Sequence, residues 1–305
     1  MTNEDAPRGP SWRGVLPGLG GMVLLGSTVA VIGATHHLPS FAVQSARYAV
    51  AALGIVAVAR CLRVRLVPPR GRELVWVVAG ALSGLVLFNL AVVLGTRHTE
   101  PGVFGAAVAC VPIVLAVAGP MARGGRPPAR LVAGAVVVSV GAVAVAGWSR
   151  ADVPGVLLAA SLPVCEAAFT LFGARVVGRL GAWSYSAATC GVAAASFLVL
   201  SVVVERPDPA GFADPAVLLA VGYLGLLGTA VAFVLWFTCV RRVGAGVAGL
   251  TAGIAAPSTA LCGFTFGAPL PSAGAWLGMG LIAAGLAVGL APARRAAARH
   301  PVDAP

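Results

Sequence analysis

The chain has 305 residues, of which 59% are hydrophobic and only 10% charged. Soluble globular domains are about one quarter charged, so this composition excludes that class and indicates a membrane protein with several crossings. A net charge of +11 at pH 7 would favour a nucleic-acid partner in a soluble chain. All basic residues are arginines that lie mostly in short loops. We therefore expect no nucleic-acid partner and interpret the charge as a signal of membrane topology.

Apolar runs of about 20 residues, the length that crosses a hydrocarbon core of about 30 Å, recur along nearly the whole chain. They predict an all-α membrane protein with ten transmembrane helices, near residues 15–35, 41–60, 74–95, 102–121, 130–148, 153–175, 182–204, 215–239, 244–266 and 273–291. Tails of residues 1–14 and 292–305 remain. The first apolar run is too long for a signal-peptide core, so we expect the first helix to be retained.

The arginines predict the orientation of these helices. If the N-terminus is cytoplasmic, seventeen arginines fall on the cytoplasmic side, namely Arg8, Arg13, Arg60, Arg63, Arg65, Arg70, Arg72, Arg123, Arg126, Arg130, Arg175, Arg179, Arg241, Arg242, Arg294, Arg295 and Arg299. Only Arg97, Arg150 and Arg206 fall outside. Because cytoplasmic loops carry the excess of positive charge, both tails are predicted to be cytoplasmic, which requires an even number of helices.

The sequence contains no motif for an enzyme, a cofactor or a metal. The six cysteines form no CxxC pair, and no Walker loop, GxSxG or HExxH is present. The LSG at residues 82–84 lacks the histidine base that serine chemistry needs within a span. His36, His37, His98 and Glu100 are suitable ligand types at the predicted outer helix ends, but their spacing does not require a metal. We expect no catalysis, no ATP hydrolysis, no cofactor and no metal.

An internal repeat relates the two halves of the chain. VFGAAVACVPIVLAVAGP (103–120) followed by LVAGAVVVSVGA (131–142) is similar to VAGLTAGIAAPSTALCGF (247–264) followed by WLGMGLIAAGLA (276–287). The alignment pairs Pro112 with Pro257, Gly134 with Gly278 and Gly141 with Gly285. Each copy, residues 15–148 and 153–291, then holds five helices. An odd number places the copies in opposite orientations, the inverted-repeat plan of secondary transporters.

These residues resemble the EamA family of the drug/metabolite transporter superfamily over roughly residues 15–291. In the first copy the likeness lies in LLGSTVAVIGATHHLPSFAVQSARYAVAAL (24–53), and in the second in GYLGLLGTAVAFVLWFTCVRRVGAGVAGLTAGIAAP (222–257) and GLIAAGLAV (280–288). The resemblance implies two EamA repeats, a central cavity and transport of small metabolites, frequently by efflux across the inner membrane. The family commonly has a Leu-Gly-Glu element after its fourth and ninth helices. Residues 122–128 and 266–271 contain no acid, so no role is transferred from those glutamates.

Glu166, within LPVCEAAFT (162–170), is the only acid deep inside a predicted span. A carboxylate at the centre of a membrane helix costs roughly 2.5–3.5 kcal/mol on insertion scales, so it needs a reason to be there. It lies about 20 Å from the outer end of its helix and shares a face with Pro163 and Thr170. One hypothesis is a residue that couples protons or binds a substrate amine. The alternative is a protonated glutamate hydrogen-bonded between helices.

Arg47 is the basic counterpart, with Gln44 and Tyr48 on the same face of the second predicted helix, about 9 Å below the outer surface. It could bind a substrate carboxylate or phosphate, or extend toward the outer headgroups. Glu166 lies about 10 Å deeper, so the pattern predicts no direct ion pair; together the two could bracket an amphoteric solute.

Further candidates lie within the predicted helices. Asn89, Tyr223 and Trp236 are candidate cavity-lining residues; the alternatives are an interhelical hydrogen bond for Asn89 and packing or an interfacial belt for the aromatic residues. Pro112, Pro163 and Pro257 each remove a helical hydrogen bond and are either gating hinges or static kinks.

The resulting expectation is a secondary transporter of the inner cell membrane that exports small polar metabolites such as amino acids by alternating access, with Glu166 as the candidate proton site. Its expected partners are a small-molecule substrate, the lipid bilayer and protons; association into a homodimer stays open. An uptake permease or facilitator is the alternative within the same class. A non-transporting membrane scaffold or lipid-binding protein is the alternative of a different class.

Overall fold

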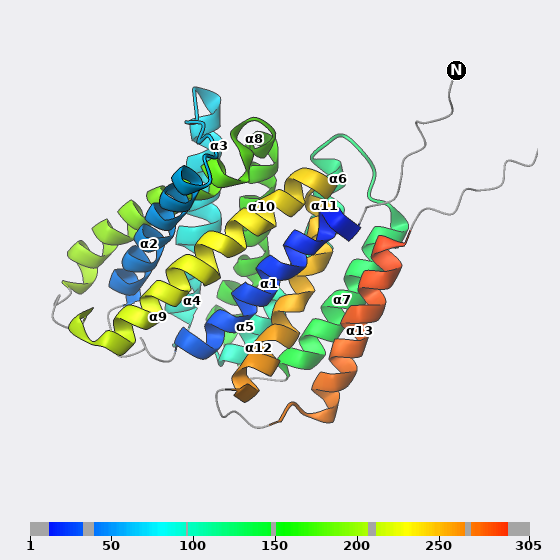
Figure 1. Ribbon diagram of the computed structural model, residues 1–305. Helices are drawn as coiled ribbons and strands as arrows, with labels where there is room; N and C mark the ends of the chain where they lie inside the picture. The colour runs from blue at the N-terminus through cyan, green and yellow to red at the C-terminus, as the bar shows by residue number, and fades with distance from the viewer. Residues whose placement is uncertain are drawn as a thin grey trace, which may run out of the picture.

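The computed structural model describes residues 12–32, 40–95, 97–147, 151–206, 212–265 and 270–291, and within these ranges it is a bundle of helices (Figure 1). The one extended pairing in the described ranges is an isolated bridge between Thr99 and Ala151. Eight helical stretches of this part are long and apolar enough to cross a membrane. The predicted tails lie outside the described residues, apart from 12–14 at the start of the first helix.

The helices of the first half follow the predicted spans within a few residues. They are α1 (Trp12–Ile32), α2 (Ser40–Cys61), α3 (Arg72–Gly80) continuing through the π-helix η2 (Ala81–Leu87) into α4 (Phe88–Gly95), α5 (Pro101–Val108), α6 (Val111–Met121) and α7 (Ala129–Ala146). The second half comprises α8 (Val153–Leu200), η3 (Ser201–Glu205), α9 (Pro215–Gly225), η5 (Leu226–Val231), α10 (Ala232–Val243), α11 (Ala245–Thr251), η6 (Ala252–Ile254), α12 (Ala255–Thr265) and α13 (Ala273–Leu290).

The long helix α8 folds back on itself at Gly181. This residue has φ 75° and ψ 164°, a backbone conformation that favours glycine. The hydroxyl of Tyr185 donates to the carbonyl of Phe169 over 3.2 Å, although sixteen residues of straight helix would separate them by about 24 Å. Residues 153–180 and 182–200 are therefore two helices. The sequence predicted that the first would end near residue 175, but it continues to Leu180 and turns without a loop.

Several predicted spans contain interruptions at related places in the two halves. The third and eighth spans each contain a π-helix, η2 and η5. The fourth is broken between α5 and α6 just before Pro112, and the ninth changes to the 3₁₀ turn η6 just before Pro257. Proline has no N–H to donate to the carbonyl four residues earlier, which accounts for these two breaks. By contrast, α8 continues through Pro163, and its non-helical backbone lies at Gly181.

Helices α7 and α13 pack side by side through glycines (Figure 1). A methyl group added at Gly141 would lie 2.6 Å from the carbonyl oxygen of Gly278, and one added at Gly134 would lie 2.8 Å from that of Gly285. Because residue numbers rise along one helix as they fall along the other, the two helices are antiparallel. Small residues permit this close approach, which is the main source of helix association in lipid.

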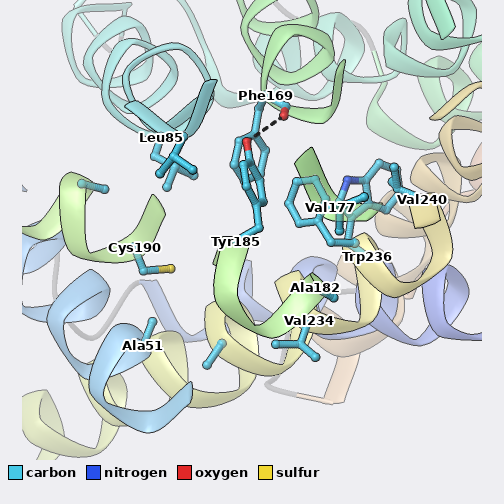
Figure 2. Close-up of a cluster of buried hydrophobic side chains, with 14 of the residues drawn as sticks. Ala51, Leu85, Phe169, Val177, Ala182, Tyr185, Cys190, Val234, Trp236 and Val240 are labelled. Carbon is cyan, nitrogen blue, oxygen red and sulfur yellow. Dashed lines mark hydrogen bonds between the residues drawn. The ribbon is translucent and has the colours of Figure 1, made fainter. Parts of the chain in front are cut away.

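The largest buried cluster centres on the aromatic residues next to the fold-back of α8. Figure 2 shows Tyr185 with its hydroxyl directed to the backbone of Phe169, beside Leu85 and Trp236. The rings of Tyr185 and Phe237 have centroids 4.5 Å apart and meet edge to face, as do those of Phe169 and Phe237 at 5.0 Å. This cluster joins both parts of α8 to α10 in one packed core.

The glycine contact between α7 and α13 gives a test on one helix. Gly278→Val forces a side chain into the Gly141 carbonyl, so we expect a loss of about 1–3 kcal/mol of stability. Gly280→Val on the same helix is the matched control, because a methyl group there meets nothing within 4 Å. Thermal unfolding in detergent measures both. Equal melting temperatures for the two variants would contradict the packing.

Candidate functional site

Polar side chains inside the bundle meet where α2 faces α4. The amide nitrogen of Gln44 donates to the Asn89 side-chain oxygen over 2.9 Å. The amide nitrogen of Asn89 donates to the hydroxyl of Tyr48 at 2.9 Å and to the carbonyl of Leu85 at 2.7 Å. Asn89, predicted as a cavity-lining residue, is thus held in a hydrogen-bond network with both polar neighbours of Arg47.

Arg47 lies on the next part of the same helix face and is only 9% exposed. Its Nε donates to the hydroxyl of Thr229 in η5 over 2.7 Å, and that hydroxyl donates to the carbonyl of Leu224 over 2.8 Å. The guanidinium lies 5.5 Å from the centre of the Tyr48 ring, within cation–π range. The side chain is therefore enclosed by protein groups and directed to η5.

The charge of Arg47 is not balanced by any acid in the described part of the chain. The ion pairs found there are His98 with Asp152 and Arg179 with Glu73. The terminal nitrogens of Arg47 make no hydrogen bond to a described residue, and the side-chain oxygen of Gln44, one turn away, is buried without a partner. Buried polar groups are nearly always paired, and the Gln44 oxygen is an exception. A solute bound here would complete this acceptor together with the terminal nitrogens of Arg47, of which only the Nε is bonded.

Glu166 lies on the inner face of α8. It is half-buried, and Pro163 and Thr170, predicted on the same face, are both buried. Among the described residues its carboxylate has no hydrogen-bond or ion-pair partner, and in particular none in Arg47. The acid therefore faces the interior without a protein group that would fix its charge.

Three other candidates make contacts between helices. The indole N–H of Trp236 donates to the hydroxyl of Thr170 over 3.2 Å, linking α10 to α8. The hydroxyl of Tyr223 lies 2.6 Å from that of Ser27, linking α9 to α1. Sequence reasoning identified Thr170, Trp236 and Tyr223 but missed Ser27 and Thr229, because single hydroxyls are common in membrane helices and carry no local signal.

The predicted outer ends of the helices are joined by carboxylates. The Asp152 carboxylate accepts a hydrogen bond from the backbone N–H of Gly155 over 2.8 Å and lies 2.9 Å from Nδ1 of His98. The hydrogen bond from Gly155 is the main reason that the pKa of this carboxyl lies below its usual range, and the contact with His98 is the second. Glu205, at the end of η3, accepts from the backbone N–H groups of Phe41 and Ala42, at the start of α2. No group of three metal-ligand side chains lies together among the described residues, and His36 and His37 are outside them.

Residues 153–290 match the model of the EamA-like transporter family. This match places the second half of the chain, from residue 153 to residue 290, in the EamA-like transporter family. This family is one of membrane transporters, so a small-molecule substrate and a multi-pass membrane location follow. No curated protein matches the sequence.

A solved crystal structure has the same fold as this chain. It superimposes with a TM-score of 0.78 at 22% identity, and the match covers 91% of this chain and 97% of the other. At this identity the likeness establishes the arrangement of the helices and carries no information on the substrate.

The bond between Arg47 and η5 gives a second test. Thr229→Val leaves the buried Nε of Arg47 without its acceptor, and we expect a loss of about 1–3 kcal/mol of stability. The control is Thr238→Val, whose hydroxyl donates only to Val234 of its own helix. Its loss is expected to cost less, because it leaves no donor of another helix without an acceptor. Thermal unfolding in detergent separates them. A smaller loss for Thr229→Val than for Thr238→Val would show that the Arg47 contact contributes nothing.

Proposed function

We propose that the protein is a secondary transporter of the inner cell membrane that exports small polar metabolites, such as amino acids, by alternating access. Its ten transmembrane helices form two inverted repeats, residues 15–148 and 153–291, and both tails are cytoplasmic. Arg47 and Gln44 bind the solute, and Glu166 carries the coupled proton. Asn89, Tyr223, Thr170 and Trp236 position the surrounding helices, and Pro112, Pro163 and Pro257 are the candidate hinges.

The contacts between α7 and α13 support the inverted repeat. Gly134 aligns with Gly278 and Gly141 with Gly285, yet in space Gly134 lies against Gly285 and Gly141 against Gly278. Each glycine of one repeat thus contacts the residue that aligns with the other glycine. A two-fold axis between two repeats of opposite orientation produces this pattern. The π-helices η2 and η5 and the paired proline breaks also recur in both halves. In Figure 1, α1 begins and α13 ends at the same end of the bundle, which favours an even number of crossings.

The proposed site rests on the terminal nitrogens of the Arg47 guanidinium, which make no hydrogen bond or ion pair with a described residue. An arginine inside a membrane protein is expensive and is usually kept for function. A planar guanidinium matches a carboxylate with two parallel hydrogen bonds. The buried oxygen of Gln44, one turn away, then accepts a hydrogen bond from a second group on the same solute. An amino acid carries both a carboxylate and a donating ammonium group, so it satisfies both unpaired groups at once.

Glu166 supplies the coupling. Because no described side chain fixes its charge, its protonation can follow whichever side of the membrane the interior faces. A proton moving inward across 100 mV releases about 2.3 kcal/mol, which supports a solute gradient of roughly fifty-fold for one solute per proton. If protons enter the cell in exchange for solute, the solute moves outward, so this coupling favours export. Efflux is also frequent in the family.

The test uses proteoliposomes with an imposed pH gradient, an internal pH dye, and pooled amino acids and amines. We expect the wild type to move protons only when solute is present and Glu166→Gln to lose this movement. Glu100→Gln, an exposed acid before α5, is the matched control and should behave as the wild type.

Each other outcome selects an alternative. Equal solute movement in the wild type and Glu166→Gln, without proton flux, would mean a facilitator with a structural glutamate. Solute movement in the same direction as the protons would mean an uptake permease. A scaffold or lipid-binding protein would move no solute in any variant and would not be stabilised by one.

A further inference from the structure

A cavity of about 370 Å³ lies at the end of the bundle where α8 folds back. Gly181 forms part of its wall, together with Trp183 on the following helix. Arg65, in the segment after α2, and Arg241, near the end of α10, line it from the other sides, and Arg179 lies just before the turn. This end of the bundle is the predicted cytoplasmic side. We call this cavity the basic pocket.

The basic pocket carries positive charge that no acid in the described ranges neutralises at two of its arginines. Its lining contains three arginines and no acid. Arg179 is held by Glu73 through two hydrogen bonds and also donates to the carbonyl of Pro68. Arg65 and Arg241 make no ion pair or hydrogen bond to any described residue. Two guanidinium groups are thus available to an anion.

The walls of the basic pocket are fixed before any ligand arrives. The backbone N–H of Val67 donates to the hydroxyl of Ser184 over 2.9 Å, which attaches the segment after α2 to the second part of α8. The Arg179–Glu73 pair ties the start of α3 to the first part of α8. A preformed cavity binds its ligand at a lower entropic cost than one that must be assembled.

The position and lining of the basic pocket favour a phospholipid headgroup. Guanidinium groups bind phosphate oxygens with charge-assisted, often bidentate hydrogen bonds. Basic pockets between transmembrane helices on the cytoplasmic side are known sites for anionic headgroups. The lining also contains apolar side chains, including Val64, Leu180 and Trp183, which suit the glycerol and upper acyl region. We propose that Arg65 and Arg241 in the basic pocket bind a phosphate group, presented by an anionic phospholipid of the inner leaflet.

Such binding is separate from solute transport. It engages three segments that meet at this end: the segment after α2, the turn of α8 and the end of α10. A bound phosphate group neutralises the two arginines and holds these segments together, so it stabilises the folded protein by mass action. Neither Arg47 nor Glu166 lines the basic pocket, so phosphate binding there does not depend on their roles.

The experiment measures the melting temperature of the full chain in a neutral detergent with short-chain phosphatidylglycerol, with short-chain phosphatidylcholine or with inorganic phosphate. We expect phosphatidylglycerol to raise the melting temperature by about 2–4 °C, the shift that corresponds to about 1 kcal/mol, and phosphatidylcholine to have little effect. The double variant Arg65→Gln/Arg241→Gln should lose most of this rise. Arg13→Gln/Arg126→Gln removes the same charge from exposed arginines outside the pocket lining and should keep it.

The outcomes separate the sources of the phosphate group. If inorganic phosphate gives the same rise, and the rise depends on Arg65 and Arg241, the ligand is a free phosphorylated solute, not a lipid. If the two double variants respond alike, or the wild type shows no rise, the proposal is overturned. Native mass spectrometry of the wild type and both double variants gives an independent measure, because the Arg65→Gln/Arg241→Gln protein should retain less bound phosphatidylglycerol.

Discussion

Inside a hydrocarbon core there is no water to hydrogen-bond a polar group, so every such group needs a partner within the protein or its ligand. The bond between Arg47 and Thr229 follows from this constraint. It uses a hydroxyl of the π-helix η5, whose own proton goes to the carbonyl of Leu224. The same requirement brings Asn89 to Gln44 and Tyr48, and Trp236 to Thr170. These polar contacts join α2 to η5 and α4, and α10 to α8.

Close packing of glycines supplies the frame in which these contacts form. The antiparallel contact of α7 and α13 depends on Gly141 and Gly278, where no side chain would fit. Gly181 allows α8 to reverse direction in a single residue, which places Tyr185 against Phe169. The reversal also creates the basic pocket at the end of the bundle. Polar satisfaction and small-residue packing together account for a structure with few charged contacts.

The sequence predicts the spans well, because the length needed to cross a membrane is a strong local constraint. The bounds of α2 and α13 agree with the predicted spans within one residue. The turn at Gly181 was placed only approximately, since a glycine inside an apolar run can equally continue a helix or end it. Arg47 and Gln44 could be recognised as polar residues on one face. Their partners could not, because Thr229 lies 182 residues away from Arg47 and periodicity carries no information on such contacts. The role of Glu166 stays a prediction, because a helix position alone does not say what an acid exchanges.

In the proposed function, Arg47 binds the anionic group of the solute. The most direct test compares the thermal stabilisation of the purified protein by amino acids with that by the matching carboxamides, which lack the carboxylate. We expect an amino acid to stabilise the wild type and its carboxamide not to do so. We also expect Arg47→Gln to bind the acid at least about thirtyfold more weakly, the factor that corresponds to about 2 kcal/mol for a truncated buried charge pair. Equal stabilisation by acid and carboxamide, or full affinity in Arg47→Gln, would contradict this role of Arg47.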